Sequence, residues 1–483
     1  MLFLRKQLIE LLIVVRLTMS LELVFFTLML IMPLVTLRLI MVLLKCSTVE
    51  IPKIIKWSDY SLSLDKRYTS SKSASTLVSY SSWKVCNREH FNYKDMVKRI
   101  GHIHEDICTV KNIALADNQA RVGKTGSRKF IEEHDENRKQ EDLFLLASLI
   151  NGTYKTSDYK NDIIYEPKKR IISKLPYYPD RIAHHAIMNI LKPIWVSRMV
   201  SFTYANIQGR GIHACKKAVE KTLRKTKDSN ETQYYLKLDI RKFYPNISHD
   251  ILKSIINHKI KDKKVLDILY EIIDSFTYEG EDKYTKDVSG LPLGNYPSGY
   301  ECNLYLTSLD RWIKEELKIK YVFRYADDIL IFHPSKDYLH KVLICIKLYV
   351  KEVLHLEVKP NYCIAPVDKR PIDFIGYVFT HRYTKVRKRI KLRFKKVISE
   401  YTKGKISTIK VRRIIPSYYG WLSAGDCKRL LTACLNMTYG YKRNKIYNIL
   451  SDLINKVEDN NQNNKVTIKH KRKVRRKRGI RNN

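Results

Sequence analysis

The chain has 483 residues, which is long enough for several subdomains built around more than one hydrophobic core. Its 90 lysines and arginines against 49 aspartates and glutamates give a formal net charge of +41, which favours a polyanionic partner and says nothing about the fold. Nine cysteines occur without a C-x-x-C pair. This pattern disfavours a disulfide framework and a zinc site, and it indicates reduced thiols in a cytoplasmic protein.

Residues 1–48 are predominantly apolar, and the run from Leu23 to Leu44 approaches the roughly 20 residues that a membrane-spanning helix needs. Two interpretations stay open: a membrane anchor, or sequence translated upstream of the true start codon. Arg38 inside the run weighs against an anchor, and the missing small-residue cleavage site weighs against a signal peptide. We expect a cytoplasmic protein, with membrane attachment disfavoured. Residues 49–85, rich in Ser, Lys and Tyr, are predicted to form a linker.

Helical periodicity dominates residues 91–150, where apolar residues recur every three or four positions. Core-facing side chains are expected in the second half of this region, at Leu143, Leu145, Leu146, Leu149 and Ile150. A turn at 166–169 should lead into a strand that begins near Arg170. The sequence Pro179-Asp180-Arg181 places a proline and an acid where a helix begins, and it predicts a helix there.

Further helices are predicted after the N-cap residue Ser248, from Val265, and from Leu339. A Gly/Pro-rich loop at 290–299 should lead into one more helix, and residues 374–379 are predicted to form a single strand. Beyond Arg382, helical patterns alternate with heavy positive charge. The basic segment 469–481 is expected to bind nucleic-acid phosphates without sequence preference; a solvated end with no dedicated partner is the alternative.

Two segments place acidic residues beside apolar strands. Residues 323–332 (Phe-Arg-Tyr-Ala-Asp-Asp-Ile-Leu-Ile-Phe) predict a tight β-hairpin with Asp327 and Asp328 at its bend, and residues 234–240 predict a second strand with Asp239 at its end. A solvated Asp-Asp turn is the alternative for the hairpin taken alone. If the two strands are neighbours in one sheet, Asp239 and Asp327 converge where two divalent ions can bind for in-line phosphoryl transfer.

These segments, with Gly290-Leu291-Pro292-Leu293-Gly294 between them, resemble the palm of a reverse transcriptase. The resemblance covers roughly residues 90–440, and it looks nearest to bacterial and phage enzymes of the retroelement type, including those of diversity-generating retroelements. It implies an α+β right-hand polymerase with fingers, a palm built on an antiparallel sheet, and a helical thumb. The implied organisation is an apolar segment (1–48), a linker (49–85), fingers (86–233), a palm (234–380), a thumb (381–456) and a basic tail (457–483).

The resemblance implies that Asp239, Asp327 and Asp328 are the catalytic carboxylates, with two Mg²⁺ ions held mainly by Asp239 and Asp327. Because side chains alternate along a strand, Asp328 is expected in a supporting role. The backbone carbonyl of Ile240 is an implied further ligand, since Mg²⁺ prefers an octahedral shell of oxygens. Lys359 resembles a family lysine that protonates the leaving pyrophosphate.

The implied nucleotide site has a ring that excludes the ribonucleotide 2′-hydroxyl, a loop against the incoming base, and two arginines whose guanidinium forks suit a triphosphate. These residues are Tyr244, Leu293, Gly294, Ser298, Arg170 and Arg181. For either arginine, a solvated surface group is the alternative. Most reverse transcriptases carry glutamine at the position of Leu293, and diversity-generating enzymes carry an apolar residue, so reduced fidelity is a hypothesis. Gly299 departs from both patterns, which expect proline or glutamine.

Arg210, Gly376 and Tyr377 are the implied contacts to template or primer. The expected function is therefore RNA-directed DNA polymerisation, with an RNA template, a DNA or RNA primer, dNTPs and an accessory protein as partners. One alternative is a maturase-like or catalytically idle RNA-binding protein, although three intact acids argue against idleness. A second is an antiphage or retron-type polymerase that shares the same chemistry.

Overall fold

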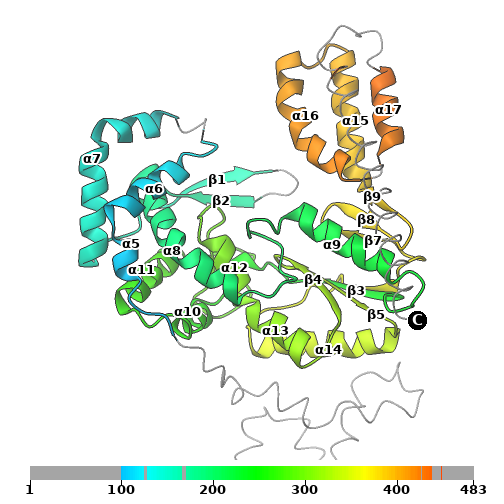
Figure 1. Cartoon of the computed structure of the whole chain (residues 1–483), viewed down its shortest axis with the longest axis horizontal. Coiled ribbons are helices and arrows are strands. Elements are labelled where there is room, and N and C mark those ends of the chain that lie inside the picture. Colours follow the sequence, from blue (N-terminus) through cyan, green and yellow to red (C-terminus); the bar gives the residue numbers. More distant parts are fainter. Residues whose placement is uncertain (1–98, 125–127, 166–169, 426, 438–447, 449–483) are drawn as a thin grey trace, which may run out of the picture. The chain divides into compact units, whose positions relative to one another are not determined.

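The computed structural model describes residues 99–124, 128–165, 170–425, 427–437 and 448 (Figure 1). The predicted apolar segment (1–48), linker (49–85) and basic tail (457–483) lie outside these residues, as does the predicted turn at 166–169. Among the described helices, none combines the length and the apolar character that crossing a bilayer requires.

Helices and a two-stranded sheet make up most of the described residues between 99 and 230. Its elements are α5 His104–Ile107, α6 Val110–Ala120, α7 Arg128–Asn151, β1 Lys160–Ile164, β2 Arg170–Lys174, the helical turn η5 Tyr177–Arg181, α8 Ile182–Arg198 and α9 Ile212–Lys225. Strands β1 and β2 pair antiparallel, with Ile164 opposite Arg170. The strand predicted near Arg170 and the helix predicted after Pro179 are confirmed as β2 and α8.

The apolar stripe predicted on α7 is only partly buried. Leu145 and Leu149 are 1% and 0% exposed, whereas Leu143 and Ile150 are 58% and 43% exposed. The prediction that Leu143 and Ile150 face a core is therefore wrong. Helix α7 packs against α6 and η5, and the contacts of one face leave residues on the opposite face in solvent.

A four-stranded antiparallel sheet supports the predicted acids. Its strands are β3 Tyr234–Asp239, β4 Tyr321–Tyr325, β5 Asp328–His333 and β6 Cys363–Pro366, in the order β4-β5-β3-β6. The hairpin predicted at residues 323–332 is confirmed as β4 and β5, and the predicted strand beside it as β3. Because β3 and β5 are neighbours, Asp239 lies directly opposite Asp328.

The two faces of this sheet belong to two separate hydrophobic clusters, because successive side chains of a strand point to opposite faces. Leu236 and Ile331 belong to the larger cluster, which includes Leu339 and Ile346 of helix α14. On the other face, Leu330 belongs to a second cluster together with apolar residues of α9. The sheet is thus covered on both sides, and its acids lie at one end of buried strands.

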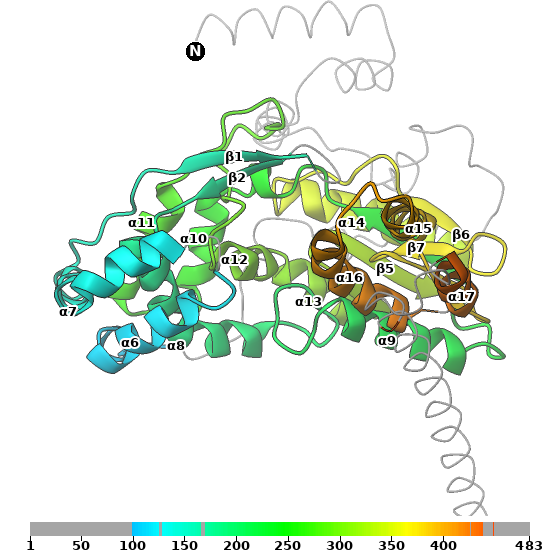
Figure 2. The same cartoon turned by 90° about the horizontal axis from the view of Figure 1, so that it is seen from above.

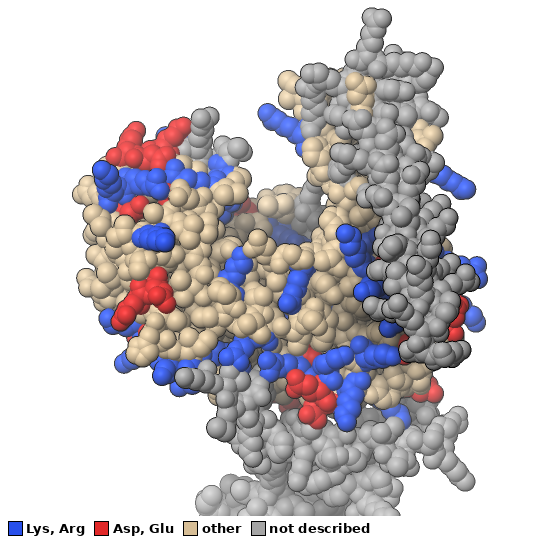
Figure 3. All heavy atoms as spheres, viewed as in Figure 1, with Lys and Arg blue, Asp and Glu red and all other residues tan. Residues whose placement is uncertain are grey.

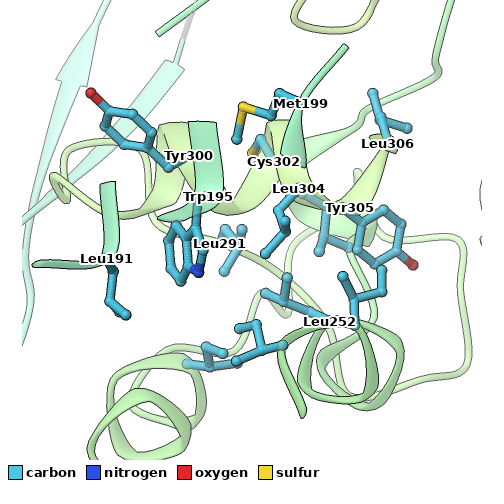
Figure 4. Packing of buried hydrophobic residues seen from close by; sticks show 14 of the residues in the cluster. Leu191, Trp195, Met199, Leu252, Leu291, Tyr300, Cys302, Leu304, Tyr305 and Leu306 are labelled. Carbon is cyan, nitrogen blue, oxygen red and sulfur yellow. The ribbon is translucent and has the colours of Figure 1, made fainter. Parts of the chain in front are cut away.

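Four α-helices lie between β3 and the hairpin in the chain, and one follows the hairpin: α10 His249–Asn257, α11 Lys263–Asp274, α12 Ser298–Tyr305, α13 Thr307–Glu315, and then α14 Lys336–Glu352. They confirm the helices predicted after Ser248, from Val265 and from Leu339. The helix predicted after the Gly/Pro-rich loop is instead divided, with α12 and α13 meeting at Leu306. Trp195 of α8, Leu252 of α10 and Leu304 of α12 pack together in the larger cluster (Figure 4).

Residues 374–379 do not form the single strand that was predicted. They contain the end of β7 (Ile372–Phe374) and the whole of β8 (Tyr377–Phe379), and these pair as an antiparallel hairpin with Phe374 opposite Tyr377. The intervening Ile375 and Gly376 have φ values of 45° and 85°. Two consecutive left-handed residues are what a two-residue hairpin turn requires, so the chain reverses there. Strand β9 (Thr384–Val386) completes this small sheet.

The last described helices are α15 Lys388–Thr402, α16 Thr408–Ser423 and α17 Lys428–Met437. Helix α15 packs against both α16 and α17 (Figures 1 and 2). Phe394 and Ile398 of α15 are fully buried in the same cluster as Phe379 of β8. The helical patterns predicted beyond Arg382 are therefore confirmed over these residues.

Candidate active site

The turn of the β4–β5 hairpin brings the predicted acids together. Tyr325 pairs with Asp328, so Ala326 and Asp327 form the two-residue turn, with Ala326 at a φ of 54°. The backbone N–H of Ile240, the residue after β3, donates to the carbonyl of Asp327 at 3.3 Å. Asp239 lies opposite Asp328 in the sheet. The turn, the end of β3 and the start of β5 therefore hold three carboxylates together at one end of the two central strands.

These carboxylates lie close enough to disturb one another. Burial, followed by repulsion from Asp239 and Asp328, raises the pKa of Asp327 to about 7. Burial also raises the pKa of Asp328, and the Lys237 ammonium, 3.8 Å away, opposes that rise. A raised pKa means that negative charge at this edge is incompletely neutralised by the protein. Clustered carboxylate oxygens with unneutralised charge are a donor set that fits a divalent cation.

Lys359 neutralises the third acid. Its Nζ donates to Oδ1 of Asp239 at 2.5 Å, and its backbone N–H donates to the carbonyl of Asp239 at 2.8 Å. Both side chains are only about one-quarter exposed, at 28% and 27%. Over the described ranges, no three His, Cys, Asp or Glu side chains are placed to hold a metal ion in common. A cation that binds Oδ1 of Asp239 would compete with the Lys359 ammonium for that oxygen.

A buried ion pair anchors the β4–β5 hairpin to the helices that pack against it. Arg324 of β4 is 0% exposed, and its Nε and Nη2 donate to the two carboxylate oxygens of Asp310 at 2.7 and 2.6 Å. Its Nη1 donates to the carbonyl of Ala326 in the turn, at 3.0 Å, and to Oδ1 of Asn303, also at 3.0 Å. The guanidinium thus ties α12 and α13 to the turn that carries Asp327. Sequence reasoning missed this pair, although an arginine inside an apolar strand signals a buried partner.

A cavity of about 470 Å³, here called the Tyr244 cavity, collects most of the predicted nucleotide-binding residues. Its lining includes Arg181, Tyr244, Leu293, Gly294 and Ser298. Burial lowers the pKa of the Arg181 guanidinium, which forms no ion pair with a carboxylate among the described residues and stays charged near neutral pH. The charge of Asp327 also contributes to raising the pKa of Tyr244. The carboxylate cluster therefore acts electrostatically on a residue of the cavity lining.

Gly294 is required because the backbone of its loop approaches the backbone of β2 closely. It has a φ of 141°, and a Cβ at this position would lie 2.4 Å from the carbonyl oxygen of Ser173 in β2. The adjacent Leu293 carbonyl accepts a hydrogen bond from the Ser173 N–H at 3.0 Å. The approach is thus made to β2, and glycine lets the loop lie directly against that strand.

The other predicted residues lie apart from the cavity lining. Arg170 is exposed at the start of β2. Arg210 donates to the carbonyl of Val200 at 3.0 Å. Gly376 forms the β7–β8 turn beneath Trp421, where a Cβ would lie 2.3 Å from the indole. Tyr377 is 0% exposed in the second cluster; its side chain packs the core, so the predicted direct contact with nucleic acid is not available to that side chain here.

Sequence reasoning also missed two residues of the Tyr244 cavity, His185 and Asn206. The His185 ring stacks on Tyr296 with centroids 4.2 Å apart and planes 7° from parallel. Burial, followed by repulsion from Arg181, lowers the pKa of His185 to about 4, so the ring is neutral at pH 7. A histidine and an asparagine without a motif around them carry no signal that would have identified either one.

Comparison with known proteins agrees with this geometry. The family described as "Reverse transcriptase (RNA-dependent DNA polymerase)" matches residues 159–379. The putative COX1/OXI3 intron 2 protein of Saccharomyces cerevisiae is 23% identical over 199 residues, covering 30% of this chain and 23% of that protein. The group II intron-encoded protein LtrA of Lactococcus lactis subsp. cremoris is 26% identical over 179 residues, covering 37% of this chain and 28% of that protein.

Among solved structures, apo telomerase from Candida tropicalis aligns at 13% identity with a TM-score of 0.40, covering 63% of each chain. The chain spans less than a third of the length of the two curated relatives named above. The matched family region contains the hairpin, the strand beside it and the loop against β2. Residues 159–379 thus match the reverse transcriptase family, and the described part of this region combines helices with antiparallel sheets.

Proposed function

We propose that the protein is an RNA-directed DNA polymerase of a bacterial or phage retroelement, which adds deoxynucleotides to a primer 3′-hydroxyl on an RNA template. The observation that carries the proposal is the meeting of Asp239, Asp327 and Asp328 at one sheet edge, in electrostatic contact with the Tyr244 cavity. We assign the fingers to residues 86–233, the palm to 234–380 and the thumb to 381–456.

In this proposal Asp239, Asp327 and the carbonyl of Ile240 hold two Mg²⁺ ions, with Asp328 supporting them. Bound there, such ions supply the positive charge that activates the primer hydroxyl and stabilises the leaving pyrophosphate. The Arg181 guanidinium binds the triphosphate, and Tyr244 stands against the sugar. Lys359, whose ammonium donates to Asp239 in this structure, would donate a proton to the leaving pyrophosphate.

The charge distribution supports a nucleic-acid partner. On the face shown in Figure 3, Lys and Arg side chains are spread over most of the described surface, and Asp and Glu side chains gather in a few groups. Helix α15 exposes Lys388, Arg389, Lys395 and Lys396, and Glu400 is its one acidic residue. A surface of this kind binds phosphates with an affinity that falls steeply as salt rises.

The test is primer extension by the purified protein on poly-rA/oligo-dT with Mg²⁺, comparing wild type with Asp327→Ala. Loss of one of the acids that hold the ions should reduce the rate by at least about 1,000-fold. The control is Asp267→Ala, because Asp267 is an exposed acid on α11. Extension that survives in Asp327→Ala would refute the assigned site.

The same experiment distinguishes the proposed polymerase from the alternative, a catalytically idle, maturase-like RNA-binding protein. Such a protein would bind the RNA template with salt-dependent affinity, and neither wild type nor Asp327→Ala would extend the primer. The raised pKa of Asp327 argues against that alternative, because an idle protein gains nothing from keeping carboxylates in mutual repulsion.

A further inference from the structure

One residue of the Tyr244 cavity links the proposed sugar-facing ring to an unusual glycine. Asn206 lies in the loop before α9 and adopts a φ of 55°, a left-handed conformation that asparagine tolerates better than most residues. Its Nδ2 donates to the carbonyl of Gly299, in the first turn of α12, at 3.2 Å. The asparagine and the glycine are 93 positions apart in the chain, so the fold alone brings them together.

Glycine is required at position 299 because the Asn206 side chain leaves no room for a Cβ there. A Cβ built at this position would lie 2.8 Å from both Cγ and Nδ2 of Asn206, closer than side-chain atoms pack. The Asn206 amide thus fills the volume that any other residue at 299 would use. This contact explains the departure noted in the sequence, where proline or glutamine is expected and glycine is present.

Asn206 also reaches the ring of Tyr244. Tyr244 and Asn206 line the same cavity, and the Asn206 side chain and the Cys302 thiol on α12 both act on the pKa of the Tyr244 hydroxyl. Proximity to Cys302, followed by burial, raises the pKa of this hydroxyl, which therefore stays protonated. The hydroxyl can donate to the sulfur while it accepts from the amide. Polar groups from the loop before α9 and from α12 can thus restrict the orientation of the ring.

We propose that Asn206 and Gly299 form a matched pair that positions Tyr244 and so sets the discrimination between deoxyribonucleotides and ribonucleotides. The inference rests on the proposed polymerase function. Asn206 is a positioning residue: it acts through the ring, which meets the sugar. Removing the amide leaves the ring free to rotate away from the 2′-hydroxyl, and adding a side chain at 299 pushes the amide out of place.

The catalytic test compares single-nucleotide incorporation of dTTP and UTP on the poly-rA template by kcat/KM. Asn206→Ala should lower the dTTP-to-UTP preference about 5- to 10-fold, the range for loss of one hydrogen bond. Tyr244→Phe lacks the hydroxyl, so adding Asn206→Ala to it should change the preference less than about twofold. Gln208→Ala, in the same loop and outside the cavity lining, is the matched control.

A second cycle tests the packing without any catalysis. Gly299→Ala alone should lower the melting temperature, because its Cβ collides with Asn206. In the Asn206→Ala background the collision is gone, and the same substitution should raise the melting temperature, since alanine is favoured over glycine in a helix. An equal effect of Gly299→Ala in both backgrounds would overturn the matched pair.

The outcomes separate the two proposals. A wild type that extends with dTTP while Asn206→Ala keeps its full preference removes the role of Asn206 and leaves the polymerase intact. A wild type that incorporates neither nucleotide removes the polymerase, and the sugar-selection role falls with it. If Asn206→Ala lowers the preference as much in the Tyr244→Phe background as in the wild-type background, Asn206 acts independently of the Tyr244 hydroxyl, which contradicts the inference.

Discussion

The two sides of one hairpin carry charge in opposite ways. On β4, Arg324 is fully buried and meets Asp310 through two parallel hydrogen bonds, with further bonds to the turn and to α12. At the turn and the start of β5, Asp327 and Asp328 are partly exposed and their pKa values are raised. The buried charge of Arg324 is thus fully compensated, whereas the carboxylates three and four residues later repel one another.

The difference indicates that the two groups of charges have different roles: the Arg324–Asp310 pair is structural, and the carboxylates at the turn are available to bind cations. A buried, fully hydrogen-bonded ion pair fixes geometry and has no remaining capacity to bind. Carboxylates held together without enough positive charge retain an affinity for cations. The ion pair on β4 therefore keeps the turn in place although the carboxylates at the turn repel one another.

Breaking the compensated side should have the largest effect on stability. Asp310→Ala leaves the Arg324 guanidinium buried and unpaired, which should cost about 3–5 kcal/mol of unfolding free energy in urea titrations. The exposed Arg241–Glu357 pair, 2.7 Å apart with both side chains about half exposed, is the matched control. Glu357→Ala should cost less than about 1 kcal/mol. Equal losses in the two variants would show that burial does not distinguish the pairs.

Removing the lysine from the charged side should mainly reduce the rate. Lys359→Met keeps the length of the side chain and removes the ammonium, so kcat in primer extension should fall about 100-fold with little change in KM. Lys359→Arg should restore part of the loss, because it returns the charge. Lys237→Met, which removes the more distant ammonium beside Asp328, should reduce kcat less than Lys359→Met does. A Lys359→Met enzyme within threefold of wild type would end the proposed role.

Neutralising the turn should stabilise the metal-free protein at high pH. The pKa of Asp327 is raised from 3.8 to about 7, so its protonated form stabilises the fold below pH 4 and this contribution is lost as the pH rises through 7. Asp327→Asn avoids the loss, and in EDTA at pH 8 it should be more stable than wild type by about 1–3 kcal/mol. The gain should shrink between pH 8 and pH 5 in thermal melts. A gain that is independent of pH contradicts the charge explanation.

The smallest expected effect concerns fidelity. Leu293 lines the Tyr244 cavity with an apolar side chain, so Leu293→Gln should restore a polar contact and lower misincorporation opposite template adenine about three- to tenfold. Val288→Gln, at an exposed position shortly before the same loop, controls for the added amide. Equal error rates in wild type and Leu293→Gln would discard the hypothesis of reduced fidelity.

Local pattern was enough to predict the hairpin, the strand beside it and most helices, because each depends on periodicity within about ten residues. The convergence of Asp239 with Asp327 followed from placing two such strands in one sheet, and the register confirms it for Asp239 and Asp328. The split of residues 374–379 was missed because Ile375 adopts a left-handed conformation that its type disfavours.

The partners of buried polar groups were not predictable from the sequence. Asp310 precedes Arg324 by 14 residues, and Asn206 meets Gly299 across 93. In neither pair do the two residues belong to the same helix or strand, so no repeat within one element predicts the contact. Only the packing of α12 and α13 against the hairpin, and of the 205–210 loop against α12, determines which polar atoms meet.

The tie between Leu293 and Ser173 has a mechanical consequence. One hydrogen bond and one close backbone approach join the cavity wall to β2, and β2 is paired along its whole length with β1. Any tilt of this two-stranded ribbon must carry Leu293 and Gly294 with it. A substrate that pulls on the ribbon through its phosphates would thereby reshape the surface against which its own base is read.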